Sequence, residues 1–320
     1  MRITSNIFPD SLSTQLQTIQ TSILQDQNAI SSGLKVNVAS DDPASYEGAL
    51  QMRASQLQTH GYINVAQQMQ QRTQLNYNSA TQLQTIVTNA SQLAIQAGGA
   101  LNSSDMQTLS VQVNNLLEQS VALGNSQDST GNYLFGGNYL RPGDTDPATT
   151  AAYVPFSVTR NGSNQITAVT YRGNSNVTQL EVAPGAKMDF NVVGSGSGSP
   201  GGLFINGASN VFTQLITLRN DLSAGNAPAA QATLSGINGV LNNVSTVIGA
   251  TSANLDRLNM TQNDQTQQLN QDQTTISNLT SADYASTVLD LNSKQNSLQA
   301  ALQAGSKILN LSLMNYLPVP

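Results

Sequence analysis

The sequence predicts a mainly α-helical fold with a small β insert, in which both chain ends form an elongated antiparallel helical bundle or coiled coil. Apolar residues alternate at steps of three and four along both ends and along two long middle segments. Between the middle segments the period changes to two, which is typical of short strands. Asn and Gln number 34 each, against 12 Lys and Arg and 18 Asp and Glu. Such amide-rich surfaces are neutral and polar, as expected for long exposed helices.

The composition excludes several classes of function. Aromatic residues make up 5% of the chain and Trp is absent, which argues against one large globular core. A net charge of −6 with only four Lys gives no basic patch, so we expect no nucleic acid and no membrane as partner. Cysteine is absent, which removes disulfides, thiolate nucleophiles and cysteine-ligated metal. Residues 1–9 are too polar for a cleaved signal peptide, and no run of about 20 apolar residues occurs.

Residues 1–42 form the first predicted coiled-coil assembly segment. Asp10 or Ser11 can cap a helix that ends at about Ser32, before Gly33. The residues that repeat at steps of three and four on one face of a helix are called its seam. The seam of this helix consists of Leu12, Leu16, Ile19, Ile23, Asp26 and Ile30. Asp26 either meets Lys294 or Lys307 of the last helix as a register device or is solvated, and both readings stay open.

Residues 43–140 form the first part of a predicted long-helix rod. Asp42 followed by Pro43 is a good helix start, and the three-four spacing continues from Thr59 to Ala94 before Gly98 and Gly99. A capping box formed by Ser104 and Gln107 opens a second helix, with a seam that runs from Leu109 to Leu123 and ends near residues 129–131.

Residues 141–207 form the predicted β-rich domain. One hairpin joins residues 156–159 to residues 166–171 around Asn161-Gly162, and two more strands, 177–182 and 188–193, flank Pro184-Gly185. The glycine-rich run 194–202 is predicted to be a flexible linker or loop, because it lacks the Gly-Lys-Ser/Thr ending of a phosphate-binding loop.

Residues 208–279 form the second part of the rod. The three-four alternation runs from Leu234 to Leu279, and it becomes polar at Gln262, Gln265 and Asp272. Each polar position forfeits about 1 to 3 kcal/mol of burial relative to Leu, so this coil should be weak without neighbours.

Residues 280–320 form the second assembly segment. Thr280 and Asp283 are predicted to form a capping box at the start of its helix. An ordinary internal bundle explains the middle helices, whereas the interrupted seams at the chain ends favour assembly between copies. We expect these ends to gain order upon assembly. The predicted assembly interface consists of Leu12, Leu16, Ile19, Ile23, Ile30, Tyr284, Val288, Leu291, Leu298, Leu302 and Leu309.

The candidate chemical sites favour structural roles. His60 is the only histidine and lies within a long helix pattern, so we interpret it as a solvated residue. The Asp41-Asp42 pair resembles a carboxylate pair for acid-base chemistry, yet the following proline favours a role as helix-start acceptors. We therefore predict no catalytic residue, no metal, no cofactor and no enzymatic activity.

Several blocks of the sequence resemble the flagellin superfamily. A serine-glycine-leucine-basic segment in residues 29–37 leads to an acidic pair in residues 39–44, and residues 282–285 and 298–304 are similar to the other end of the family. Three features resemble the hook-filament junction branch: Asp41-Asp42-Pro43, the block 131–137 and the ending 311–317. The tail 318–320 departs from that branch, whose chains tend to stop at the leucine-rich end.

The resemblance covers roughly residues 1–140 and 229–317. It implies a structural adaptor whose terminal helices build a ring between the first hook-associated protein and flagellin. The implied partners are other copies of the chain, these two proteins and a cytoplasmic export chaperone that holds the C-terminal helix. The implied location is extracellular, after flagellar type III export without a cleaved signal peptide. Two alternatives stay open: filament flagellin itself and, from another class, a coiled-coil signalling or adhesive rod.

Overall fold

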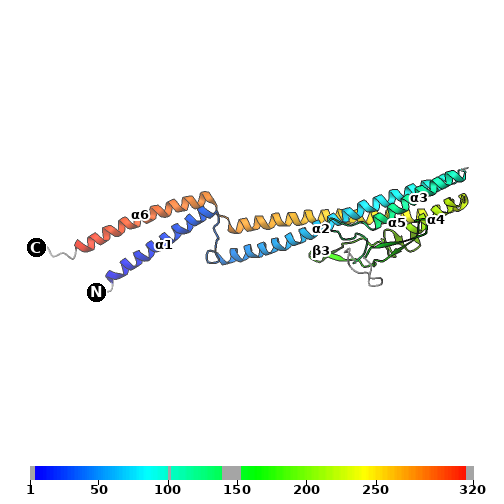
Figure 1. Ribbon diagram of the computed structural model, residues 1–320. Helices are drawn as coiled ribbons and strands as arrows, with labels where there is room; N and C mark the ends of the chain where they lie inside the picture. The colour runs from blue at the N-terminus through cyan, green and yellow to red at the C-terminus, as the bar shows by residue number, and fades with distance from the viewer. Residues whose placement is uncertain (1–3, 100–101, 139–152, 315–320) are drawn as a thin grey trace. The chain divides into compact units, whose positions relative to one another are not determined.

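The computed structural model describes residues 4–99, 102–138 and 153–314, and its long elements are helices (Figure 1). The chain divides into two compact units. Unit 1 comprises Met1–Thr59 and Thr266–Pro320, and unit 2 comprises His60–Gln265. The predicted mainly α-helical class with a small β insert is confirmed. The helices are α1 (Thr4–Ser32), α2 (Pro43–Gln96), α3 (Ser103–Gly124), α4 (Val211–Ser223), α5 (Ala227–Thr280) and α6 (Tyr284–Met314).

A glycine and an aspartate set two helix boundaries in unit 1. Gly33, at φ +72°, donates its N–H to Ala29 O and ends α1 as predicted. Asp42 Oδ1 accepts the N–H groups of Ala44 and Ser45 at 3.1 and 3.2 Å and caps α2. The hydroxyl of Ser45 also donates to Asp42 and lowers the pKa of this carboxyl.

Three predicted helix starts are wrong. The first helix begins at Thr4 rather than near Asp10 and contains Pro9 in its second turn, where the backbone loses the hydrogen bond that proline cannot donate. Asn102 caps α3 in place of Ser104, with its side-chain oxygen 2.9 Å from Asp105 N. Thr280 is the last residue of α5, so Asp283 alone caps α6 by accepting Ala285 N.

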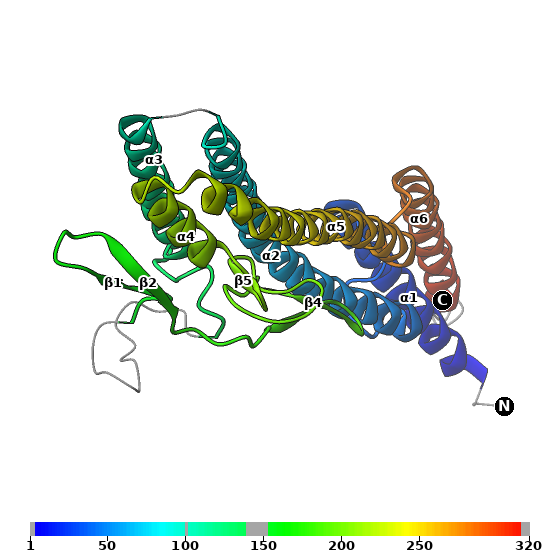
Figure 2. The same ribbon diagram turned by 90° about the vertical axis from the view of Figure 1, so that its right-hand side faces the viewer.

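Unit 2 is built around α3, α4 and its parts of α2 and α5, with the strands along one flank (Figure 2). The helix α4 lies inside the predicted rod 208–279 as a separate element. Asn210 caps it, and Gly225 at φ +69° separates it from α5. One continuous apolar core joins α2, α3, α4 and α5, with Leu83, Leu117, Leu218 and Val244 fully buried.

Within the described residues, the strands form three separate antiparallel pairs. Strands β1 (Phe156–Arg160) and β2 (Ile166–Tyr171) make the predicted first hairpin, and β3 (Gln179–Ala183) and β4 (Ala186–Asp189) make the second. The short β5 (Ile205–Asn206) pairs with β6 (Ser209–Asn210). Rings of Phe135, Phe156, Phe204, Phe212 and Tyr171 pack at centroid distances of 5.0 to 5.6 Å and tie the first hairpin to the helices.

The glycine-rich run 194–202 is a loop whose two ends are packed and whose residues 197–200 are exposed, so of the two predicted readings the loop holds. Gly201 and Gly202 are buried, and Gly194 N donates to Phe135 O. A Cβ at Gly202 would lie 2.5 Å from Gly196 N and Ile205 O. Glycine is required here because two backbone segments meet at van der Waals distance.

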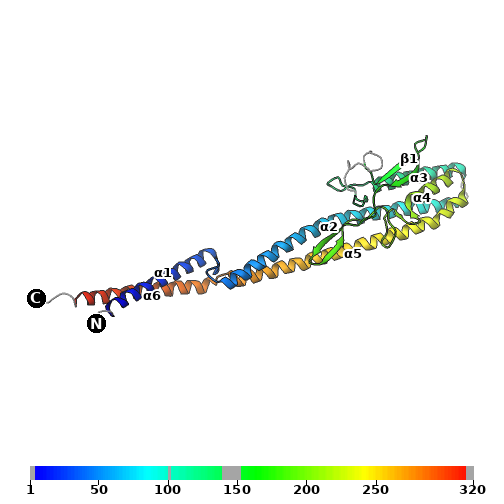
Figure 3. The same cartoon turned by 90° about the horizontal axis from the view of Figure 1, so that it is seen from below.

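The helices α2 and α5 run side by side and antiparallel (Figure 3). Amide side chains lie along their contact. In unit 2, Gln70 donates to Asn259 at 2.7 Å and accepts from Gln262. In unit 1, Gln56 donates to Gln273 at 3.3 Å. The polar seam predicted at Gln262 is therefore a set of hydrogen-bonded amide pairs, which costs less than unpaired burial.

Candidate assembly surface

The helices α1 and α6 pack against each other as an antiparallel pair within unit 1. Near one end of the pair, Lys294 Nζ lies 2.7 Å from Asp26 Oδ2 and 2.9 Å from Asp26 Oδ1. Near the other end, a Cβ built on Gly305 would lie 2.9 Å from Leu12 Cδ2, so the missing side chain lets the helices approach closely. The two chain ends thus meet in one copy, and of the two readings of Asp26 the contact with Lys294 is the one present.

This pairing covers only part of the predicted interface. Ile23 is buried, and seven other predicted interface residues are half-buried: Leu12, Leu16, Ile19, Ile30, Val288, Leu291 and Leu298. Tyr284 is 65% exposed and Leu302 is 52% exposed. The side chain of Leu309, in α6, lies outside the described residues. The pair therefore leaves apolar surface open to a further partner.

Two exposed apolar residues of this surface were missed by the sequence analysis. Leu24 is 59% exposed and Leu289 is 70% exposed. Each directly follows a seam residue, Ile23 and Val288, and so falls about 100° around the helix from the seam. A pair of adjacent apolar residues on an otherwise polar helix was the available signal that these helices have a second apolar face.

The connectors that flank α1 and α6 are hydrogen-bonded to one another. Lys35 N donates to Thr280 O at 2.7 Å, and Ala282 N donates to Gly33 O at 2.9 Å. Asp41 Oδ2 accepts the N–H groups of Asn37 and Val38. Asp42 is therefore the helix-start acceptor that was predicted, whereas Asp41 binds backbone N–H groups of the connector instead of the helix start.

The block 131–137 is held on α2 in unit 2 by a buried arginine. Arg72 donates to Asp128 Oδ2 and Tyr133 O at 3.1 Å each, and its guanidinium carbon lies 4.9 Å from the centroid of the Phe190 ring. Burial lowers the pKa of Arg72, and Asp128 opposes that shift. Burial alone would raise the pKa of Asp128, but hydrogen bonds from Thr130 and Asn132 together with Arg72 lower it.

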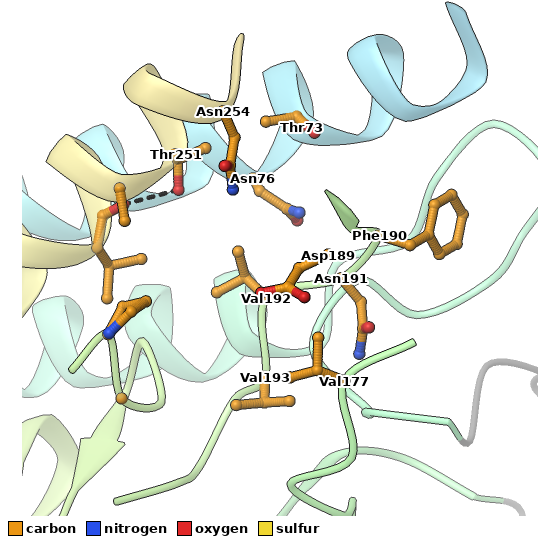
Figure 4. Close-up of a pocket in the computed structure, with 14 residues that line it drawn as sticks. Thr73, Asn76, Val177, Asp189, Phe190, Asn191, Val192, Val193, Thr251 and Asn254 are labelled. Carbon is orange, nitrogen blue, oxygen red and sulfur yellow. Dashed lines mark hydrogen bonds between the residues drawn. The ribbon is translucent and has the colours of Figure 1, made fainter. Parts of the chain in front are cut away.

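A cavity of about 120 Å³ lies between α2, α5 and the segment around β4 (Figure 4). Thr73 and Asn76 of α2 and Asn254 of α5 lie on one side of it, with Asp189 opposite. Asp189 is the only titratable residue among the described residues of this lining. The lining therefore offers no pair of groups for acid-base chemistry, and a cavity of this size suits a few water molecules.

His60 is exposed on α2, as predicted. Within residues 4–99, 102–138 and 153–314, no three His, Cys, Asp or Glu side chains are grouped closely enough to hold a metal ion. No helix in the described part of the chain has the length and apolar content to cross a membrane.

Comparisons with known proteins point to one family. The bacterial flagellin N-terminal helical region matches residues 3–139. Flagellar hook-associated protein 3 of Salmonella typhimurium is 24% identical over 324 residues, which covers 98% of each chain.

Solved structures agree on the fold. A flagellar hook-associated protein from Vibrio parahaemolyticus matches with a TM-score of 0.61 at 17% identity and covers 75% of this chain and all of its own. Flagellar hook-associated protein 3 from Legionella pneumophila matches with a TM-score of 0.58 at 15% identity, over 72% of this chain and 98% of its own. Residues 3–139 therefore carry the flagellin N-terminal helical region, and the chain resembles, along nearly its whole length, flagellar hook-associated protein 3 of the flagellin superfamily.

Proposed function

We propose that this chain is a structural adaptor of the bacterial flagellum, which assembles as a ring and joins the hook-associated region to the flagellin filament. The similarity to hook-associated protein 3 over 98% of the chain supports this role. The structural observation that carries it is the α1–α6 pair, in which both chain ends meet and still leave Tyr284, Leu289 and Leu302 exposed. Apolar residues that remain exposed on paired helices indicate a further binding partner.

The proposed mechanism couples order at the chain ends to assembly. Fixing the backbone costs about 1 to 2 kcal/mol per residue, and burying a Leu or a similar side chain returns about 1.5 to 3 kcal/mol. A helix pair with mostly half-buried seams is therefore marginal alone. Terminal helices of neighbouring copies would cover the exposed residues and stabilise the pair of α1 and α6.

The proposed partners are other copies of the chain, the first hook-associated protein on one side of the ring and flagellin on the other. Before export, a cytoplasmic chaperone would cover α6, since its apolar residues favour association in the cytoplasm. The proposed final location is the extracellular flagellum. The role requires no catalysis, because its free energy comes from packing.

Loss of the chain in a flagellated cell tests this role directly. Electron microscopy should show hooks without filaments, and flagellin should accumulate in the medium. Expression of the full chain should restore filaments. Normal filaments in cells that lack the chain would contradict the proposal.

Deletion of residues 280–320 tests the terminal helices. The truncated chain should fail to restore filaments, while circular dichroism should still show a folded helical unit 2, because the core of that unit lies within residues 60–265. Loss of the whole helical signal would contradict the idea that the terminal helices serve assembly while unit 2 folds without them. Purified full chain that polymerises without limit from filament seeds would favour filament flagellin instead.

A further inference from the structure

The cavity of about 120 Å³ in unit 2 is lined in part by polar side chains that are almost fully buried. Asn76 and Thr73 of α2 are 2% and 5% exposed, and Thr251 of α5 is 3% exposed. The exposed residues Asp189 and Pro200 of the lining come from β4 and from the glycine-rich run. Asn and Thr are seldom buried to this extent unless their polar atoms are hydrogen-bonded. The partners of these polar atoms therefore indicate what the cavity holds.

Two polar side chains of the lining have partners within the protein. Thr251 Oγ1 donates to Val247 O at 2.7 Å, within α5 (Figure 4). Asn191 Oδ1 accepts the N–H of Thr178 at 2.7 Å, and Asn191 Nδ2 donates to Asn176 O at 3.1 Å. These two side chains need no ligand, because the protein gives each of their polar atoms a partner.

Three other side chains line the cavity without such partners. Asn76 Oδ1 is a buried atom that accepts no hydrogen bond. Among the described residues, the amide nitrogen of Asn76, the hydroxyl of Thr73 and the side-chain amide of Asn254 have no hydrogen bond either. Figure 4 shows Asn76 and Asn254 extending from neighbouring helices toward the same space. An exchange of the oxygen and nitrogen positions of the Asn76 amide would not help, since neither atom has a partner.

The lining offers what bound water requires. A cavity needs about 10 to 15 Å³ for each water molecule, so about 120 Å³ is room for several. Each molecule also needs roughly two to four polar partners, and the three helix side chains supply both donors and acceptors. Asp189 lies opposite them (Figure 4), and because its Oδ1 accepts from Gln179 Nε2 at 2.9 Å, its Oδ2 is a further acceptor. A dry cavity would be expected to have apolar walls throughout.

We propose that ordered water molecules fill this cavity and bridge Asn76 and Thr73 of α2, and Asn254 of α5, to Asp189 of β4. Water fits a site with neutral donors and acceptors on one side and a carboxylate oxygen on the other, because each molecule both donates and accepts. The bridge gives Asn76 Oδ1 the donor that the protein itself does not supply. It thereby offsets most of the cost of burying that amide.

The water site completes the attachment of the β3–β4 hairpin to the long helices. Met188 of β4 belongs to an apolar cluster with Ala66 and Met69 of α2. The next positions on this face of α2, at steps of four and three, are Thr73 and Asn76. The face of α2 that meets the hairpin therefore changes from apolar to polar where the cavity begins. Apolar contact holds the hairpin on one side of this boundary, and the water molecules hold it on the other.

A crystal structure of the full chain, determined before and after pressurisation with xenon, tests the occupant. We expect electron density for ordered water within hydrogen-bond distance of Asn76 Oδ1. We expect no xenon in the cavity, because xenon enters apolar cavities that are dry. Xenon at this position would overturn the proposal, and so would density for a buffer solute in place of water.

A double-variant cycle tests the bridge in solution. No direct hydrogen bond joins Asn76 to Asn254, so coupling between their substitutions indicates a shared water. Asn76→Ala and Asn254→Ala should each raise the unfolding equilibrium constant of unit 2 about tenfold, the usual effect of one lost hydrogen bond. The double variant should raise it about thirtyfold rather than about a hundredfold, because the bridge is lost only once. Native-state hydrogen exchange at core amides of α3 and α4 measures this constant.

The matched control combines Asn76→Ala with Asn263→Ala. Asn263 is exposed on α5 and does not line the cavity, so the effects of these two substitutions should multiply. Multiplied effects of Asn76→Ala and Asn254→Ala would show that the two amides act independently and would overturn the bridge. Circular dichroism of each variant confirms that the helices are intact.

Discussion

Lys294 of α6 donates two hydrogen bonds to the carboxylate of Asp26 on α1, across 268 positions of sequence. The Asp26 side chain is 14% exposed and that of Lys294 is 36% exposed, so the pair is partly shielded from water. A buried charge without its partner is costly, so a shift of one helix along the other is opposed at this position. We therefore predict that this contact helps to set the register in which the two chain ends meet.

Removal of the lysine charge should loosen the terminal helix pair. Lys294→Met should destabilise the pair by about 1 to 2 kcal/mol, between the values for exposed and buried ion pairs. Hydrogen exchange of the purified full chain should then accelerate at α1 and α6 amides and stay unchanged in unit 2. The control Lys307→Met removes an exposed charge of the same helix and should change little. Unchanged exchange in Lys294→Met would refute the register role.

Two glycine-to-alanine variants should change stability in opposite directions. Gly124→Ala places a Cβ 2.6 Å from Phe156 Cδ2, and this overpacking should cost about 1 to 3 kcal/mol. Gly249→Ala meets nothing within 4 Å inside α5 and should stabilise by about 0.5 to 1 kcal/mol through helix propensity. Urea unfolding followed by circular dichroism separates the two. Equal changes in the unfolding free energy of both variants would show that helix propensity alone, without packing, determines the effect of these substitutions.

Arg72 should be among the most sensitive polar residues of unit 2. Arg72→Met leaves the carbonyls of Tyr133 and Leu134 without a buried donor, which should cost about 1 to 3 kcal/mol for each unsatisfied group. Arg72→Lys should not rescue the loss, because an ammonium cannot reproduce the planar fork of donors. Arg53→Met, on the exposed side of the same helix, is the matched control. A wild-type unfolding curve for Arg72→Met would contradict this account.

Stability of unit 2 should fall in acid through two carboxyls. Arg160 lowers the pKa of Glu118 by a hydrogen bond, and bonds from Thr130 and Asn132 outweigh burial to lower the pKa of Asp128. The stabilisation from both carboxyls is complete above their pKa values in the unfolded chain, which are about 4. It is lost as the pH falls through their lower pKa values in the folded chain. Asp128→Asn should weaken unit 2 at pH 7 and flatten its pH dependence below about pH 5. Urea titrations across this range provide the measurement, and an unchanged slope would contradict the assignment.

Local sequence signals predicted the elements that depend on neighbouring residues. The end of α1 at Gly33, the start of α2 at Asp42-Pro43 and the Asn161-Gly162 hairpin all follow from backbone preferences within a few positions. The three-four spacing likewise predicted the long helices and the inward faces of α2 and α5. The five-segment division of the chain and the assembly interface stay predictions.

Signals that were locally ambiguous led to errors. Ser104 and Asn102 can both cap a helix, and the packing of α3 in unit 2 selects Asn102. Thr280 has the chemistry of a cap, but its carbonyl accepts Lys35 N and its hydroxyl bonds within α5. The glycine run has a linker composition, yet its ends are held by contacts such as that of Gly194 N with Phe135 O, and Gly194, Gly201 and Gly202 are buried.

The sequence by itself determined the three-four spacing of the helices and the two-residue alternation of the strands. It also determined the helix ends at glycine and proline and the amide-rich seams, because all of these depend on intrinsic residue preferences. Only the tertiary structure decided which distant groups satisfy each other. Arg72 reaches carbonyls about sixty residues further along the chain, and buried Gln265 donates to Val182 O of β3. Such pairs form because a buried polar group must find a partner, and no local pattern specifies which one.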